Sequence, residues 1–357
     1  MARLVFAAVA LLCVSCGLSE AEVSDPNDLQ LSTAEGELRT NRDADRVVVY
    51  SNNVENMIFD WKDLVHHMGE HELRPDVFLV QQVTGRDGLD RLMGFMKTRL
   101  GVDYDGLVAQ NQPTDRRFSG EVQPRPKVST GVVWRSSRFE LVSHDSWMPF
   151  GTGFSSGAQS CDGRSNHSGY ETLRVKLFDR VAKKHVVVIS LRHWTWEPCS
   201  TKNLVELVGG KEGVNAHVGI GPQADLAIVG GDFNDHPVDG SGQYKCWYRQ
   251  MVRDISEAQC ANESNFGFTD PMFESCNGER SCVRKVEGID SLFARRADGT
   301  PVKTNHFEII SWEEAHRASV RSTGGDGRSN LQSRDGYVDQ ADRYSGHEAR
   351  RAYFFYQ

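Results

Sequence analysis

The sequence predicts an α/β (α+β) fold in which two mixed β-sheets pack as a sandwich with helices on the outside. Short runs of β-branched and aromatic residues, typical of buried strands, alternate with segments whose apolar residues recur at helical spacing. Several neighbouring strands are separated only by short turns, and such hairpins form antiparallel pairs that a purely parallel sheet lacks. The sequence contains no internal repeat and no linker that divides its folded part.

The predicted strands have apolar cores of four to seven residues, as buried strands do. Residues 47–50 are β-branched and aromatic, and the run at 226–229 leads directly into two glycines, which allow a tight turn. We expect residues 130–134 and 138–142 to pair as a hairpin. In order, the predicted strands cover residues 47–50, 76–80, 130–134, 138–142, 173–178, 185–191, 226–229, 289–293 and 352–355.

Helical spacing distinguishes three other segments: residues 60–68, 89–100 and 202–208. In the second of these, Leu89, Leu92 and Met96 fall on one helix face. His66 and His67 are expected on a helix surface. Residues 151–169 are rich in Gly and Ser, and residues 317–342 in Gly, Ser, Asp and Arg, which predicts a long loop in each place.

The N-terminus has the pattern of a secretion signal. Arg3 precedes an unbroken apolar stretch over residues 4–14, small residues follow, and the chain then becomes acidic and polar. The stretch is too short for a transmembrane helix, and a buried first helix is the alternative. We therefore predict a signal peptide over residues 1–22, a polar leader over 23–45, a folded domain over 46–357, and a secreted (extracellular or periplasmic) protein.

Cysteine usage agrees with export. Two of the eight cysteines fall in the predicted signal, where a lipid anchor on Cys16 is the less favoured alternative. The other six form an even set, which in an exported chain argues for disulfides. The preferred pairs are Cys276–Cys282, Cys246–Cys260 and Cys161–Cys199. A zinc site is disfavoured because these six cysteines include no Cys-x-x-Cys pair.

The net charge of −8 and a pI of about 5.9 disfavour a passive nucleic-acid binder, which is normally basic. An acidic enzyme can still act on phosphates when a bound cation supplies the local positive charge.

The segment Ala-Ile-Val-Gly-Gly-Asp-Phe-Asn at residues 227–234 is the most informative motif. Asp232 and Asn234 are two apart, so on an extended backbone both side chains point to one face at the end of a core strand. The carboxylate can hold a proton or a metal, and the amide can donate to a phosphate oxygen. An ordinary turn is the alternative, since Asp, Asn and Gly are common turn residues.

Four further segments occur in a fixed order around this motif: SNNVEN at 51–56, DVFLVQQV at 76–83, a strand at 186–193 that ends in Leu-Arg-His, and GIDS at 288–291, followed by YSGH at 344–347. Together they resemble the endonuclease/exonuclease/phosphatase superfamily, which includes pancreatic-type deoxyribonucleases, abasic-site endonucleases, neutral sphingomyelinases and inositol-polyphosphate 5-phosphatases. The resemblance covers residues 47–355. It implies a four-layer sandwich with the site at one end of the two sheets.

The resemblance also implies roles for individual residues. Asp232 would orient or deprotonate the attacking water, and Asn234 would bind phosphate. His193 would contact the phosphate or protonate the leaving group. Asp290 would pair with His347, the final His, which would stabilise the pentacoordinate phosphate.

On the metal side, the resemblance implies that Asn53 positions the metal or phosphate. Gln82 stands where the family has a metal-binding Glu, and Gly346 replaces the Asp of a Ser-Asp-His motif. A neutral Gln is a poorer magnesium ligand than a carboxylate. Glu55 keeps an acidic group nearby, with Glu348 or Asp342 as alternatives.

These observations predict a secreted, monomeric, metal-dependent phosphoesterase that hydrolyses phosphodiesters in the manner of a nuclease. The expected cofactor is a divalent metal, Mg²⁺ first, with Mn²⁺ or Ca²⁺ as alternatives. The expected partner is a phosphodiester substrate, either nucleic acid or a lipid headgroup, and no membrane span is expected. The alternatives are a non-catalytic binding protein on the same fold, favoured by Gln82 and Gly346, and a sphingomyelinase-like lipid phosphodiesterase.

Overall fold

The computed structural model of the chain describes residues 44–71, 74–109, 129–147, 172–192, 224–253, 255, 265–286, 288–323 and 345–357. They belong to the compact unit Asp43–Gln357. The predicted signal peptide, the helix at 202–208, the loop at 151–169 and His193 lie outside the described residues.

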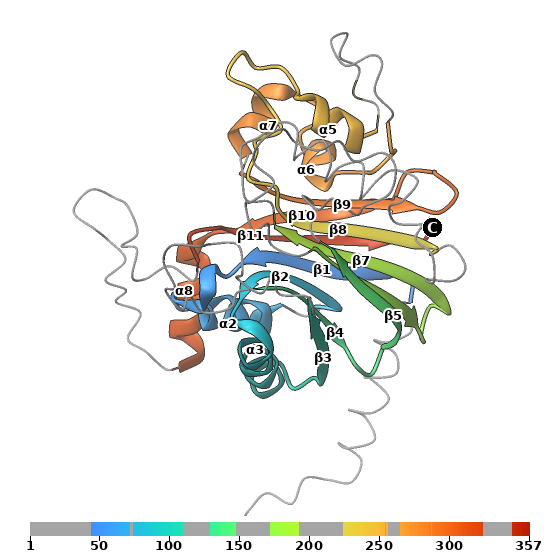
Figure 1. The fold of residues 1–357 in the computed structure, drawn as a ribbon. Coiled ribbons are helices and arrows are strands. Elements are labelled where there is room, and N and C mark those ends of the chain that lie inside the picture. Colours follow the sequence, from blue (N-terminus) through green and yellow to red (C-terminus); the bar gives the residue numbers. More distant parts are fainter. Residues whose placement is uncertain are drawn as a thin grey trace, which may run out of the picture. The chain divides into compact units, whose positions relative to one another are not determined.

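Two mixed β-sheets form the centre of this unit, which confirms the predicted fold class (Figure 1). The first sheet has the order β10-β11-β1-β2-β4-β3, with only β1 and β2 parallel. The second has the order β5-β6-β7-β8-β9, with only β7 and β8 parallel. Their bounds are β1 Arg46–Asn53, β2 Val77–Val83, β3 Tyr104–Val108, β4 Ser129–Arg135, β10 Thr304–Ile310 and β11 Ala349–Phe355 in the first sheet, and β5 Phe139–Trp147, β6 Thr172–Asp179, β7 Lys184–Arg192, β8 Leu226–Asp232 and β9 Asp290–Arg296 in the second.

Helices cover the outer face of each sheet and complete four layers (Figure 1). The first sheet is covered by α2 (Lys62–Glu70), α3 (Gly85–Leu100) and α8 (Trp312–Thr323). The second is covered by α5 (Cys246–Met251), α6 (Pro271–Ser275) and α7 (Arg280–Val286). A short 3₁₀ helix, η1 (Glu55–Met57), follows β1. In the described part of the chain, no helix is both long and apolar enough to cross a membrane.

Central strands are buried on both faces, which explains why they read as continuous apolar runs. In β1, Val47 and Val49 pack into the core between the sheets, whereas Val48 and Tyr50 pack under the helices. This alternation follows from the two-residue period of a strand.

The predicted hairpin between residues 130–134 and 138–142 is wrong. β4 pairs with β2 and β3, whereas β5 pairs with β6 in the other sheet. The chain changes sheets at Arg138, whose buried guanidinium donates from Nη1 to Asp76 Oδ2 at 2.8 Å and from Nε to Asp179 Oδ2 at 2.9 Å. Asp76 directly precedes β2 and Asp179 ends β6, so the buried charge is paired with both sheets where the chain crosses between them.

Three further expectations need correction. Residues 317–323 belong to α8 and not to a loop, because Ala315 and Ala318 bury the inner face of that helix. Strands β3 and β10 were not predicted. His67 is buried at 2% exposure, while its neighbour His66 is partly exposed.

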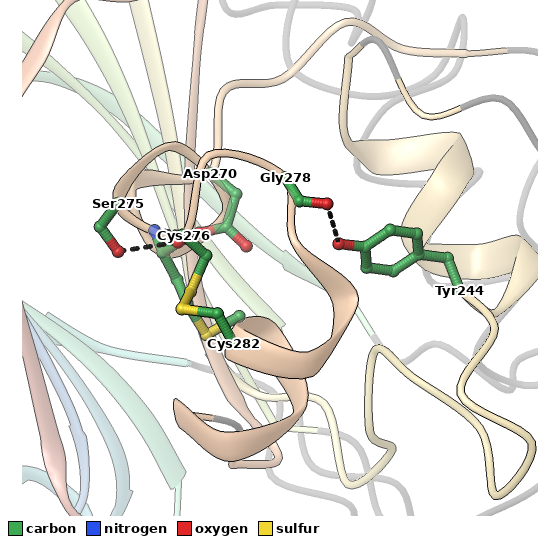
Figure 2. The surroundings of a disulfide bond; sticks show 7 residues. Tyr244, Asp270, Ser275, Cys276, Gly278 and Cys282 are labelled. Atoms are coloured by element: carbon green, nitrogen blue, oxygen red, sulfur yellow. Dashed lines mark hydrogen bonds between the residues drawn. A yellow bond between two sulfur atoms is a disulfide. The ribbon is translucent and has the colours of Figure 1, made fainter.

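The predicted disulfide Cys276–Cys282 is present and joins the end of α6 to α7 (Figure 2). A hydrogen bond also holds the loop that this disulfide closes. Tyr244, just before α5, donates its hydroxyl to the carbonyl of Gly278 in that loop at 3.2 Å. Cys246 is disulfide-bonded, and its predicted partner Cys260 lies outside the described residues. The pair Cys161–Cys199 lies there too.

Candidate active site

Four of the predicted residues meet at one end of the sandwich. Asn53 ends β1, Asp232 ends β8, and Asp290 begins β9 directly opposite Asp232 in the antiparallel register. His347 lies just before β11, which is antiparallel to β1. Strand direction therefore brings residues from both sheets to the same end.

Gly231 determines how Asp232 enters the site. Its φ is +149°, and a Cβ at this position would lie 1.9 Å from the carbonyl oxygen of Leu191 on the neighbouring strand. Only glycine allows the two backbones to approach this closely.

The buried Asp232 carboxylate accepts hydrogen bonds from both sides. Asn53 Nδ2 donates to Oδ2 at 3.0 Å, and Asn234 donates its backbone N–H to Oδ1 at 2.9 Å and its amide to Oδ2 at 3.2 Å. Arg192 Nε lies 3.3 Å from Oδ2. Burial and the nearby Asp290 charge raise the pKa of Asp232 to about 6, although His347, Arg192 and the Asn234 N–H act in the opposite direction.

His347 and Asp290 form a hydrogen-bonded pair, with 2.8 Å between Nδ1 and Oδ2. Burial opposes a charge on the imidazole, but the Asp290 carboxylate and its hydrogen bond outweigh burial, and Asp232 and Glu55 add to them. The pKa of His347 therefore rises to about 9. At neutral pH the ring is a cation held against a carboxylate.

The backbone around His347 is anchored to the end of β1. Asn52 Nδ2 donates to the carbonyl of His347 at 2.9 Å, and the His347 N–H donates to Ser345 Oγ at 3.1 Å. The Ser345 hydroxyl in turn donates to the carbonyl of Asn53. The Ser of the YSGH segment thus orients the histidine.

Glu55 folds back into the site through a turn of left-handed residues. Glu55, Asn56 and Met57 have φ values of +42°, +64° and +57°. The Glu55 N–H donates to Asn53 Oδ1 at 3.1 Å, and Glu55 Oε2 accepts the N–H of Gly346 at 2.9 Å. A Cβ at position 346 would lie 2.4 Å from that oxygen, so this position of the carboxylate depends on Gly346.

These contacts leave one proton of the imidazolium pointing into the site. Nε2 of His347 lies 3.3 Å from Asn53 Nδ2 and 3.7 Å from Glu55 Oε1. Asn53 already donates to Asp232 and accepts from Glu55, which fixes the orientation of its amide. Because Asn53 Nδ2 and the Nε2 of a charged ring are both donors, the Nε2 proton faces the Glu55 carboxylate, and a substrate oxygen could replace that partner.

Gln82 lies near the end of β2, the strand that pairs in parallel with β1. It has a φ of +55° at an irregularity in the pairing of β2 with β4, and its neighbour Gln81 pairs with Asn53 in the β1–β2 register. The Gln82 side chain is 7% exposed and makes no hydrogen bond to another residue in the described ranges. Its amide oxygen is thus available as a weak ligand.

The donors fit a magnesium-type ion at the lower limit of what that ion accepts. Mg²⁺ is commonly held by one or two carboxylates together with substrate phosphates. Of the residues that the resemblance assigns to the metal, Glu55 would supply a carboxylate, and Gln82 and Asn53 would supply amide oxygens. Asp232, Asp290 and His347 also offer atoms within 4.8 Å of one another, but an imidazolium cannot ligate a cation.

Arg192 is a site residue that the sequence analysis passed over. It ends β7, is 9% exposed, and faces Asp232 across the parallel β7–β8 pair. The sequence feature that could have identified it is a charged residue at the end of the mainly apolar run in β7. His193, which follows it, lies outside the described residues, as does Asp342.

The fold and the site define a two-sheet α/β sandwich with a buried carboxylate and a charged His–Asp pair at one end. No protein-family model matches the chain, and no curated protein is similar in sequence.

Among solved structures, similar ones include an endonuclease/exonuclease/phosphatase family protein from Bacteroides thetaiotaomicron (14% identity, 87% of this chain and 98% of that one, TM-score 0.49). D. rerio TDP2 in complex with a single-strand DNA product shows 14% identity over 87% and 98% of the two chains, with a TM-score of 0.48. The human Nocturnin catalytic domain with bound sulfate shows 13% identity over 87% and 93%, also at 0.48.

Proposed function

We propose that this protein is a metal-dependent phosphoesterase that hydrolyses phosphodiesters. The observation that carries the proposal is the juxtaposition of Asp232, a carboxyl with a pKa of about 6, with the His347–Asp290 pair, whose imidazole has a pKa of about 9. At a pH between these two pKa values, Asp232 is a carboxylate that can act as a base and His347 is a cation. Hydrolysis of an anionic ester requires both.

In the proposed reaction a water molecule attacks phosphorus and loses a proton to Asp232. The bond between phosphorus and the leaving oxygen breaks as the new one forms. The Nε2–H of His347 and the amide of Asn234 stabilise the negative charge on the non-bridging oxygens. The leaving oxygen takes a proton, and His193 is the predicted donor.

A divalent metal, Mg²⁺ first, with Mn²⁺ or Ca²⁺ as alternatives, would be held by Glu55, Gln82 and Asn53. When bound, it would neutralise charge on the phosphate as a Lewis acid. Glu55 would compensate for the missing carboxylate at position 346, a role supported by the position of its own carboxylate beside Gly346. We therefore favour catalysis over the binding-only alternative, which rests on the neutral Gln82.

We propose nucleic acid as the substrate before a lipid headgroup. Within the described residues the large exposed apolar side chains are Ile58, Leu141 and Val142, of which only Ile58 follows the site segment η1. A single exposed residue does not form the apolar surface that binding to lipid would need. We also propose that the chain is secreted and monomeric; the signal-like N-terminus and the Cys276–Cys282 disulfide support export.

The test is an assay of the purified protein on plasmid DNA and on bis-p-nitrophenyl phosphate, with Mg²⁺, Mn²⁺, Ca²⁺ or EDTA. We expect metal-dependent cleavage that His347→Ala abolishes. His185→Ala is the matched control, because His185 lies at the opposite end of β7 and should retain activity.

Failure to cleave either substrate with any of the metals would contradict the proposal for phosphodiesters. Sphingomyelin vesicles would then test the lipid alternative. Gain of activity in Gln82→Glu would show that the missing carboxylate is the cause, whereas binding of DNA without turnover in both forms would establish the binding-only role.

A further inference from the structure

A second cluster of ligand-type side chains lies between the helix layer and the first sheet, and the proposed phosphoesterase reaction does not use it. His67 belongs to α2, and His71 is the residue that caps the end of the same helix. Glu308 belongs to β10. One ligand atom from each of the three lies within 4.8 Å of the other two.

The two imidazoles face each other in the way that two ligands of one ion do. Their positions, four residues apart, place both rings on one face of the helix end. The Nε2 atoms are 3.1 Å apart. Two nitrogens bound to one tetrahedral zinc at about 2.0–2.1 Å lie about 3.3 Å apart, so the observed separation needs little adjustment.

His67 is 2% exposed, so its ring is shielded from solvent. Imidazole binds a metal through one ring nitrogen in its neutral form. A buried pair of imidazoles with facing Nε2 atoms can therefore offer two nitrogen ligands to one cation.

The carboxylates around the pair supply the remaining ligands. Glu308 pairs with Arg351, and such an outer contact orients ligand carboxylates in many metal sites. Glu314 on α8 reaches from the other side, with Oε1 at 3.7 Å from His67 Nε2. Its side chain is 46% exposed and therefore able to move the remaining few tenths of an ångström.

We propose that His67, His71 and Glu308 form a metal site distinct from the active site. Two imidazoles and a carboxylate suit a borderline transition metal, Zn²⁺ above Mg²⁺ or Ca²⁺. Glu314 or a water molecule would be the fourth ligand. The ion would tie α2, β10 and α8 together and so stabilise the helix layer over the first sheet.

The test is a zinc titration of the EDTA-treated, full-length protein by calorimetry in the presence of excess Mg²⁺, with Co²⁺ absorption as a second readout of tetrahedral nitrogen and oxygen ligation. We expect one Zn²⁺ per chain and a higher Tm with zinc. His71→Ala should weaken zinc binding by at least tenfold, and Glu308→Gln should also weaken it, because each removes a proposed ligand. His67→Phe, which keeps a ring in the buried position, removes it.

Two controls separate this site from others. His66→Ala changes the neighbouring histidine on the same helix and should leave zinc binding intact. His347→Ala should do the same, which excludes the active-site cluster as the binding site. No zinc binding by the parent protein, binding unaffected by His71→Ala, or binding lost in His347→Ala would each overturn the proposal, and none of these outcomes depends on whether the protein cleaves phosphodiesters.

Discussion

Replacing Asp290 by Asn tests the origin of the charge on His347. The side chain keeps its size, and its amide oxygen can still accept the Nδ1 proton, but the carboxylate is lost. The carboxylate and its hydrogen bond are the largest influences that raise the pKa of His347 from 6.5 to about 9. That rise corresponds to about 3 kcal/mol in favour of the charged ring.

The expected magnitude follows from the charged fraction of the ring. At pH 8 about nine-tenths of the imidazole is charged when its pKa is about 9, against roughly 3% when its pKa is near 6.5. We therefore expect that, through the loss of charge on His347, Asp290→Asn lowers kcat/KM on bis-p-nitrophenyl phosphate about 30-fold at pH 8. The same effect should be less than twofold at pH 6. The basic limb of the pH profile should move down by about 2.5 pH units, from about 9 to about 6.5.

Stability gives an independent readout with a defined sign. Because the pKa of His347 is raised in the folded state, its contribution is fully present below pH 6.5 and is lost as the pH rises through about 9. The Tm of Asp290→Asn should thus fall furthest below that of the parent at pH 6 and approach it above pH 9. The exposed-turn variant Asp298→Asn is the control. A basic limb that stays near pH 9 in Asp290→Asn would refute the reasoning.

Three further outcomes are expected. Asp232→Asn should reduce turnover by at least about 100-fold in the same diester assay, because an amide cannot take the proton from water, and circular dichroism should show that it remains folded; residual turnover with an unshifted acidic limb near pH 6 would argue against its role as the base. Gln82→Glu should lower the Mg²⁺ concentration for half-maximal activity several-fold, because a carboxylate binds this ion better than an amide; an unchanged metal dependence would place Gln82 outside the metal site. Gly231→Ala should lower the free energy of unfolding in urea by about 2 kcal/mol or more, since its Cβ would collide with the backbone of Leu191, and a loss below about 0.5 kcal/mol would show that the strand can shift.

Most of the fold could be predicted from the sequence because the central strands are apolar on both faces. β3 and β10 were not predicted because they lie at the edges of the first sheet and mix polar with apolar residues. The wrong hairpin arose because a short connection usually joins neighbouring strands. The buried pairing of Arg138 with carboxylates from both sheets, which sends β5 to the other sheet, is a tertiary contact that local sequence does not encode.

For the site, sequence order predicted which residues lie at the ends of strands, and the structure brings Asn53, Asp232, Asp290 and His347 together. Their catalytic roles remain predictions. The complementarity of Glu55 and Gly346 could not be read from the sequence, because it depends on three successive left-handed residues and on a contact between distant segments. The burial of His67 was not predicted, because residues 317–323 were expected to form a loop. They belong instead to α8, which packs against α2.

The pairing of β1 with β11 constrains when this protein can fold. β1 comes first among the described strands and β11 last, yet they are neighbours inside one sheet, and every other strand lies between them along the chain. During synthesis, β1 can pair with β2 early, but its other edge stays unpaired until the segment that carries His347 and β11 has left the ribosome, so this sheet and the candidate site are completed together. A premature stop before β11 removes this partner of β1 along with the histidine, which leaves one edge of a central strand unpaired and the chain exposed to chaperones and proteases.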